Sequence, residues 1–449
     1  MRNLIERIIK KIKIRSIFKI YKAPSRSMDD VLRPIYILSN IFGLRVFEFS
    51  QDHSRPILSF IYSTSLYCLY SASWFYYKRW NMNIKIFELD RTISYYPIIS
   101  NQMVILVILL MGLYHSKAMK LCTKRINEID KTLRALGSSA SFSYIYKRTI
   151  IDLVIVIIYV VFFMLIIILR KVLTGQTNYK SCIIVYFLLH IYSFIIEFLL
   201  VFEFLTVVRC IKLEFQRANE LLADVTVLSV SSIASELREP READSSFSIE
   251  RSLPVYTKNL FIVALSLRQR QLQLQISSNK INRSRTLLRT IRQVHLELYR
   301  ISKNLSNMYG IQISLEIAIC IFLYTYVLYC FYVEYKKETY KMSFQFILTI
   351  LCCLQYSMKI FIVNYICDKT TKEAERTSEI IYTFYGDNKD IDIQREVEIF
   401  SLQMMQCRNL YSAFGLYNLN CKHICSCIGI ITTYIVIIIQ VTDAIKERS

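Results

Sequence analysis

The last apolar run of the chain constrains its fold more than any other segment. Residues 424–442 are nineteen consecutive uncharged residues, mostly aliphatic. A helix of this length can cross the hydrocarbon core of a bilayer, because each residue adds about 1.5 Å along the axis. Six earlier runs have comparable length, whereas a transmembrane β-strand needs only about ten residues. The predicted spans are residues 57–77, 95–114, 150–169, 182–208, 309–333, 343–366 and 424–442.

Composition agrees with a membrane protein built from helices. Among 449 residues there are only 8 Gly and 6 Pro, and 54% of the residues are hydrophobic. That share is above the usual value for soluble domains, and few residues are present that would interrupt a long helix. A backbone that faces lipid must satisfy its own hydrogen bonds, which a helix does. We therefore predict an all-α membrane protein with seven transmembrane helices.

Positive charges fall mainly on one side of the predicted spans. The N-terminal region and the second, fourth and sixth connections hold 43 of the 56 Lys and Arg residues, and the other side holds 12. Lys359 is the remaining one, inside the sixth span. Because cytosolic loops carry the excess of Lys and Arg, this distribution predicts a cytosolic N-terminus and an extracellular C-terminus. Without the long fourth connection, the division is still 27 to 12.

The net charge of +21 does not by itself indicate nucleic-acid binding, because most of it lies on the predicted cytosolic side. We expect no nucleic-acid partner. Residues 4–22 alternate Ile and Phe with Lys and Arg at helical spacing. This pattern favours an amphipathic helix on an anionic inner leaflet, with membrane lipids as partners. A disordered basic tail is the alternative.

The thirteen cysteines do not form a recognisable metal or disulfide framework. Most lie in apolar stretches, for example Cys68 and Cys320, where cysteine acts as a small hydrophobic residue. The run CKHICSC at residues 421–427 has zinc-like spacing, but no second cluster completes it. Metal binding is the alternative there to a helix that enters the bilayer. We expect no metal site and no cofactor.

Three residues of the last span share one helical face. Thr433, Ile437 and Gln440 stand at positions i, i+4 and i+7. An amide at this depth is costly unless it meets water or a partner. If copies of this helix surrounded a common axis, Ile437 would form an apolar ring that resists wetting, Gln440 a polar ring, and Asp443 a carboxylate ring at the outer mouth. The alternative is a hydrogen bond from Gln440 to another helix of the same subunit.

The same helix carries a pattern that resembles a family signature. Thr433 and Tyr434 precede five apolar residues, Gln440 follows them, and Val441 stands where the family has Phe. This arrangement is similar to the signature of the insect gustatory receptors, which are relatives of the insect odorant receptors. Two further stretches resemble the family more weakly, residues 32–44 and 295–313.

The resemblance implies a ligand-gated, non-selective cation channel. It implies four subunits, identical or shared with other gustatory receptors, around a central pore lined by the last helix. The gate and the selectivity constriction then fall at Ile437 and Gln440. The ligand is a small-molecule tastant, either a sugar or a bitter compound. The protein is expected in the plasma membrane, in the dendrite of a sensory neuron.

These inferences divide the chain into six regions. Residues 226–259, rich in Ser and charge with two of the six prolines, predict a disordered insert in the fourth connection. The regions are 1–56, the cytosolic N-terminal region with the amphipathic helix; 57–208, the first four spans; 209–308, a cytosolic linker; 309–366, the fifth and sixth spans; 367–423, cytosolic anchor helices; and 424–449, the pore helix with a short extracellular tail.

The resemblance also implies that the tastant binds in an outward-facing cleft among the second to sixth spans. Aromatic walls and a few amides suit both sugars and flat bitter compounds. Ionisable groups at membrane depth are site candidates, with a satisfied interhelical hydrogen bond as the alternative. The candidate residues are Tyr186, His190 and Glu197 on the fourth span and Gln345, Gln355 and Tyr356 on the sixth.

Other function classes fit the sequence less well. A secondary transporter is expected to show repeats with broken helices, and the spans contain almost no Gly or Pro. A metabotropic receptor needs an extracellular N-terminus, which the charge distribution opposes. An odorant receptor or coreceptor of the same superfamily is the nearest alternative. We find no phosphate loop and no nucleophile–base pairing, so we predict that the chain is not an enzyme.

Overall fold

The computed structural model covers most of the helical part of the chain. It describes the backbone of residues 27–46, 56–81, 88–138, 142–173, 180–236, 255–336, 342–387, 391–407 and 410–448. It describes the side chains of residues 27–46, 56–75, 99–138, 142–166, 191–224, 284–333, 346–347, 349–383, 391–407 and 410–444. The predicted amphipathic segment 4–22 lies outside these ranges.

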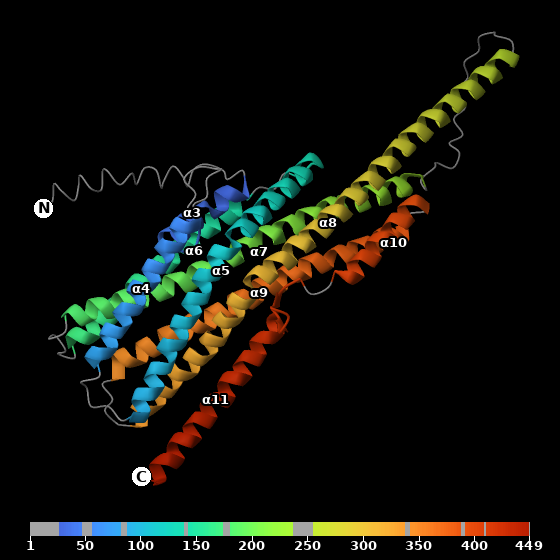
Figure 1. The fold of residues 1–449 in the computed structure, drawn as a ribbon. Coiled ribbons are helices and arrows are strands. Elements are labelled where there is room, and N and C mark those ends of the chain that lie inside the picture. The colour runs from blue at the N-terminus through green and yellow to red at the C-terminus, as the bar shows by residue number, and fades with distance from the viewer. Residues whose placement is uncertain are drawn as a thin grey trace.

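Each of the seven predicted spans lies inside one long helix (Figure 1). These helices are α4 (Pro56–Asn81), α5 (Glu88–Ala135), α6 (Ser143–Leu173), α7 (Lys180–Glu236), α8 (Val255–Lys336), α9 (Met342–Asp387) and α11 (Cys421–Arg448). A shorter helix, α3 (Met28–Ile41), precedes them, and α10 (Ile391–Gln406) connects α9 with the approach to α11. The bundle therefore has the helical content that the hydropathy pattern predicts.

Within the described residues, five helices are long and apolar enough to cross a membrane. Their mean hydropathy ranges from 1.5 to 3.0 in the most apolar window. Length and composition thus support the predicted class, an all-α membrane protein, with several candidate transmembrane helices. The five segments are Ile99–Ala135, Ser143–Ile166, Ser284–Val333, Thr349–Thr383 and Cys421–Ala444.

Helix α7 forms the centre of the bundle. It contacts α3, α4, α5, α6, α8 and α9, and it passes through the middle of the ribbon in Figure 1. Residues 199–208 in its middle section are all buried, and most of them are apolar, among them Leu199, Phe204 and Val208. A helix with apolar residues around its circumference is stable only when it is surrounded, which agrees with the central position of α7.

Helix α6 has the opposite environment. It has the highest mean hydropathy of the candidate spans, 3.0, yet only 17% of its most apolar window is buried within the chain. Its outer surface consists of large aliphatic and aromatic residues in a pattern suited to lipid. The exposed residues are Ile151, Val154, Ile155, Ile157, Ile158, Val161, Phe162 and Leu165.

The helices on either side of the fourth connection are longer than the sequence pattern predicts. Residues 226–236 continue α7 and residues 255–259 begin α8, although both fall inside the insert predicted to be disordered. No Gly or Pro occurs between Arg209 and Glu239, so nothing in the chain stops α7 before that point. Residues 237–254 lie outside the described ranges.

A small hairpin departs from the all-helical prediction. Strands β1 (Ser412–Ala413) and β2 (Tyr417–Asn418) pair antiparallel just before α11. Their turn contains two left-handed residues, Phe414 at φ 53° and Gly415 at φ 78°. Strands this short give no periodic signal in a sequence, which explains why hydropathy did not predict them.

Gly310 of α8 allows the hairpin to pack directly against the helix backbone. A Cβ atom on Gly310 would lie only 2.7 Å from the backbone nitrogen of Phe414. Two hydrogen bonds fix the same contact, because Ser306 donates to the carbonyl of Ser412 and accepts from its amide, at 2.7 Å and 3.0 Å. The chain that leads into α11 is thus held against α8 by backbone contact.

Candidate functional site

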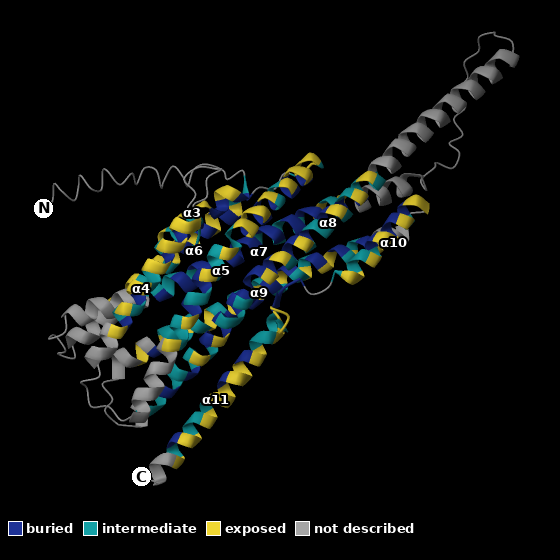
Figure 2. Ribbon diagram, in the orientation of Figure 1, coloured by how far each residue is buried: buried dark blue, intermediate teal, exposed yellow. Residues whose placement is uncertain are grey.

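Helix α11 is attached to the bundle along one narrow stripe. It lies at one flank of the bundle (Figure 1) and contacts α8 and α9. Cys427, Ile431 and Thr442 are the buried residues of its apolar span, and exposed residues occur along the rest of its length (Figure 2). Only 11% of its most apolar window is buried within the chain, against 39% for α8. Most of its circumference is therefore free for lipid or another protein.

The three residues of the predicted pore stripe lie on the exposed side of α11. Thr433 and Gln440 are exposed, and 47% of Ile437 is exposed. Gln440 is nine residues from the buried Ile431, which is about 180° around a helix with about 100° per residue. Ile437, six residues from Ile431, is about 120° away by the same measure, so the stripe as a whole faces away from α8 and α9.

The hydroxyl and amide groups of this stripe differ in their hydrogen bonding. Thr433 donates to the carbonyl of Gly429 within its own helix, at 2.9 Å. Among the described residues, the Gln440 amide has no hydrogen-bond partner. The predicted alternative, a bond from Gln440 to another helix of the same subunit, is therefore absent from the described part of the chain.

Asp443 lies in a different environment from the other three candidate pore residues. It is half-buried, and its Oδ2 accepts a hydrogen bond from the Tyr332 hydroxyl of α8 at 2.9 Å. One residue earlier, Thr442 contacts the Tyr329 hydroxyl at 3.3 Å. These contacts connect the C-terminal end of α11 to α8. Sequence spacing along α11 could not reveal them, because both tyrosines belong to another helix.

The candidate ligand residues are only partly described. Tyr186 and His190 lie on α7 and Gln345 lies on α9, but their side chains fall outside the described ranges. Gln355 is half-buried, and its Oε1 accepts a hydrogen bond from Tyr159 of α6 at 3.1 Å. Tyr356 is half-buried on α9 and packs against the core.

Glu197 forms a charge cluster that sequence reasoning did not predict. Lys359 of α9 donates to Glu197 of α7 at 2.6 Å and to Glu316 of α8 at 2.5 Å. The three side chains are between 2% and 12% exposed. Lys359 was recognised as a charge inside an apolar span, but its partners come from two other helices. The signal was the lysine itself, since a cation at that depth needs an acidic partner.

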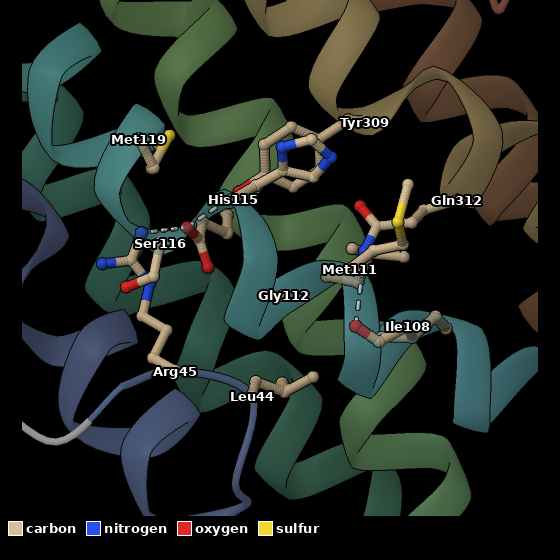
Figure 3. A pocket seen from close by; sticks show the side chains of 12 residues that line it. Leu44, Arg45, Ile108, Met111, Gly112, His115, Ser116, Met119, Tyr309 and Gln312 are labelled. Atoms are coloured by element: carbon tan, nitrogen blue, oxygen red, sulfur yellow. Dashed lines mark hydrogen bonds and ion pairs between the residues drawn. The ribbon is translucent and has the colours of Figure 1, made fainter. Parts of the chain in front are cut away.

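A second buried ion pair lies where the segment after α3 meets α7 and α8 (Figure 3). Arg45 contacts Glu203 at 2.5 Å, and Tyr309 donates to the same carboxylate oxygen at 2.8 Å. The Arg45 guanidinium also lies 3.6 Å from the ring centre of Tyr36. Gly112 permits this arrangement, because a Cβ there would lie 2.5 Å from the Leu44 carbonyl oxygen.

A small cavity adjoins this ion pair. Its volume is about 20 Å³, and Figure 3 shows Arg45, His115, Tyr309 and Gln312 around it. Gln312 donates to the Ile108 carbonyl at 3.3 Å. The cavity has room for about one water molecule, far less than the roughly 300 Å³ of a small-ligand pocket. It is therefore distinct from the predicted tastant cleft.

Cys421 and His423, in the first turn of α11, make packing contacts with neighbouring segments. His423 stacks on Tyr417 with ring centres 4.0 Å apart, and its Nδ1 contacts the Asn364 side chain at 3.1 Å. The Cys421 thiol contacts Asp368 at 3.4 Å. Among the described residues, no group of three His, Cys, Asp or Glu side chains is arranged to hold a metal ion.

Ion pairs and an aromatic contact hold α10 against α8. Arg289 contacts Glu396 at 2.5 Å, and the guanidinium groups around it lower the pKa of the Glu396 carboxyl below its usual range. His295 lies between Phe215 and Phe400, with ring centres 5.1 Å and 5.7 Å away. Burial lowers the pKa of its imidazole to about 4, so His295 is neutral at physiological pH.

Together, these features define a multi-pass, all-α membrane protein with a peripheral apolar helix and buried charge clusters between its spans. The family follows from the sequence. The sequence model of the family described as 7tm Chemosensory receptor matches residues 32–445. The chain therefore belongs to this chemosensory receptor family. This confirms the family resemblance, and it confirms the prediction that the chain is a receptor rather than an enzyme.

A curated relative and two solved structures agree with this assignment. Gustatory receptor 28b of Drosophila melanogaster is 26% identical over 133 residues, which cover 29% of this chain and 28% of that protein. The insect olfactory receptor OR5 from Machilis hrabei, in complex with eugenol, has a TM-score of 0.59 at 10% identity. OR5 alone has a TM-score of 0.60 at 11% identity. Each alignment covers 91% of this chain and 97% of OR5, and shows a shared fold.

Proposed function

We propose that the chain is a gustatory receptor and forms a tastant-gated, non-selective cation channel. Four copies of α11 surround a central pore, in a homotetramer or in a tetramer with other gustatory receptors. A small-molecule tastant, a sugar or a bitter compound, opens the pore by binding the open state more tightly than the closed state. The observation that carries this proposal is the exposed stripe of Thr433, Ile437 and Gln440, on the side of α11 that faces away from its own subunit.

The chemistry of that stripe supports a pore better than a lipid contact. A helix that faces only lipid has no use for an unpartnered amide at membrane depth, because exposing such a group to hydrocarbon is unfavourable. In a pore, Gln440 meets water, and the apolar Ile437 can close the path by excluding water. Asp443 is bound to Tyr332 on the same subunit, and it still adds negative charge near the outer mouth, which raises the local concentration of cations.

The proposed orientation has the N-terminus in the cytosol and the C-terminus outside the cell. The unequal distribution of Lys and Arg supports it. In this orientation residues 209–308 and 367–423 are cytosolic. The long extensions of α7, α8 and α9 and the helix α10 then form an anchor near the fourfold axis. The protein resides in the plasma membrane of a sensory dendrite.

The proposed tastant site is an outward-facing cleft among α5, α6, α7, α8 and α9. The structure of OR5 in complex with eugenol shows that a protein of this fold holds a small aromatic molecule. In this chain, Gln355 and Tyr159 supply a polar pair beside aromatic rings. We assign the remaining tastant contacts to Tyr186, His190, Gln345 and Tyr356.

The decisive experiment measures ion permeability in a cell that expresses the full chain. Gln440→Ala is expected to change the permeability ratios between monovalent cations during a tastant-evoked current. Tyr434→Phe is the matched control, because Tyr434 is on the same helix, 55% exposed and about 120° from Gln440. Equal ratios in wild type and Gln440→Ala would remove α11 from the conduction path. A current that G-protein inhibitors abolish would instead indicate a metabotropic receptor.

A further inference from the structure

The cluster of Lys359, Glu197 and Glu316 contains an unbalanced charge. One ammonium group serves two carboxylates, at 2.6 Å and 2.5 Å. The side chains of Glu197 and Glu316 are only 6% and 2% exposed. If all three groups are ionised, the cluster carries one net negative charge inside the membrane-spanning bundle. Burying a single uncompensated charge costs several kcal/mol, so a further positive charge is expected.

Among the described residues, no neighbouring side chain supplies that charge. The titratable groups there that act electrostatically on the cluster are phenols and a thiol, not cations. They are Tyr70 on α4, Tyr159 on α6, Cys320 on α8 and Tyr356 on α9.

The two carboxyl groups also lie close together, because Glu197 Oε2 and Glu316 Oε1 are 2.6 Å and 2.5 Å from the same Lys359 nitrogen and so at most 5.1 Å apart. Ionised carboxylates only accept hydrogen bonds, so two of them cannot bond directly unless one carries a proton. The Oε2 atom of Glu316 is buried and has no hydrogen-bond partner among the described residues. Two like-charged carboxylates that share one buried site seldom both remain ionised, as pairs that share a proton in other proteins illustrate.

We propose that Glu197 and Glu316 bind one proton between them, opposite Lys359, so that the cluster is electrically neutral. The proton comes from water and is held by two helices, α7 and α8, while the Lys359 ammonium from α9 donates to both acids. The bound proton therefore keeps the contact between the three spans electrically neutral and stabilises their packing. Alkaline solution removes the proton and leaves one net negative charge among them.

The site lies on a helix that also contacts the peripheral helix α11. The Cys320 thiol, one turn further along α8, lies 4.0 Å from Glu316. A change in proton occupancy thus acts on the packing of α8, the helix that contacts both the cluster and α11.

Infrared spectroscopy of the full chain in lipid nanodiscs tests this directly. A protonated carboxyl group has a carbonyl band that an ionised carboxylate lacks. Near neutral pH, Glu316→Gln and Glu197→Gln are each expected to lose the intensity of one carboxylic acid per chain relative to wild type. Each loses it because the remaining acid then pairs with Lys359 alone and ionises. Glu297→Gln, which changes an exposed ion pair with Arg300, is the control and is expected to keep the band.

Comparing each variant with wild type also cancels the infrared bands of other protonated carboxyl groups in the chain. Burial raises the pKa of Glu214 to about 7, so this acid adds a band of its own to every sample equally. Superimposable spectra of wild type and both glutamine variants would overturn the proposal. Loss of the band in only one variant would also overturn it, since that acid would then bind its proton alone.

Thermal unfolding in the same nanodiscs gives a second measurement. The melting temperature of wild type is expected to fall as the solution becomes alkaline. The melting temperatures of both glutamine variants are expected to fall less. Equal slopes in all three proteins would contradict the shared proton. If Glu316→Gln does not fold, Glu197→Gln gives the same comparison. Neither measurement depends on ion conduction, so failure here is distinguishable from failure of the proposed channel function.

Discussion

The Tyr332 hydroxyl of α8 donates a hydrogen bond to the Asp443 carboxylate of α11 at 2.9 Å, near the end of the peripheral helix. This is a charge-assisted bond between the proposed pore helix and its neighbour. Such bonds are stronger than neutral ones, and interhelical hydrogen bonds in membranes are worth about 0.6–2 kcal/mol. Rearrangement of α11 relative to α8 therefore changes the energy of this pair.

We expect Tyr332→Phe and Asp443→Asn each to shift the tastant concentration that gives half-maximal current. The shift is expected to be about threefold to thirtyfold, because removing the bond changes the balance between states by about 0.6–2 kcal/mol. The double variant should shift no further than the larger single variant. Additive shifts in this double-mutant cycle would show that the two residues act independently.

The close backbone contact at Gly310 predicts that one added methyl group lowers the stability of the protein. In Gly310→Ala the new Cβ would lie 2.7 Å from the Phe414 nitrogen, so the hairpin must move. Overpacking of this kind costs about 1–3 kcal/mol. We expect a lower melting temperature and a reduced current per molecule at the cell surface. For the melting temperature, Gly429→Ala is the matched control, because a Cβ at Gly429 meets nothing within 4 Å. Equal melting temperatures for the two variants would contradict the prediction.

The burial of His295 predicts that the folded protein loses stability at acidic pH. The folded protein holds the pKa of His295 at about 4, below the ordinary value of 6.5, because the imidazole is buried. The unfolded chain therefore binds the proton more tightly. The contribution of His295 is fully present above about pH 6.5 and is lost progressively as the pH falls toward 4. At pH 5 the loss amounts to about 2 kcal/mol.

The corresponding measurement compares thermal unfolding of wild type and His295→Leu at pH 7 and pH 5. The leucine variant is expected to lose less melting temperature on acidification, because it has no imidazole to protonate between Phe215 and Phe400. If both proteins lose the same amount, acid sensitivity arises elsewhere in the chain.

A buried arginine network predicts the largest loss of stability. The side chain of Arg217 is 1% exposed and contacts Asp130 at 2.5 Å and Glu214 at 2.9 Å. Arg217→Met leaves both carboxylates without this partner, which costs about 3–5 kcal/mol for a buried pair. Arg300→Met removes an exposed pair with Glu297 and is expected to cost less than about 1 kcal/mol. Thermal unfolding of the purified chains distinguishes the two; similar losses would contradict the burial argument.

The sequence predicted those features that depend on local pattern. Runs of about twenty apolar residues are visible without knowledge of their neighbours, and each run lies inside one helix. The spacing of Thr433, Ile437 and Gln440 also placed them correctly on one face of α11, and the structure adds that this face is exposed.

Features that depend on pairing between distant segments were not predictable from one sequence. Lys359 is 162 positions from Glu197 in the chain, and helical periodicity does not specify which helices become neighbours. The same limit applies to Asp443, whose partner Tyr332 is 111 positions away. The length of α7 was underestimated for a different reason, since a Ser-rich composition favours disorder without forbidding a helix.

The narrow attachment of α11 has a consequence for how such receptors diverge. Within the described residues, the side chains on its exposed face are little covered by the rest of the chain, so substitutions there are weakly constrained by their own subunit. In the proposed channel, ion preference and tastant preference can therefore change through separate mutations. A lineage could acquire a new taste and keep its electrical response, or alter the response and keep the taste.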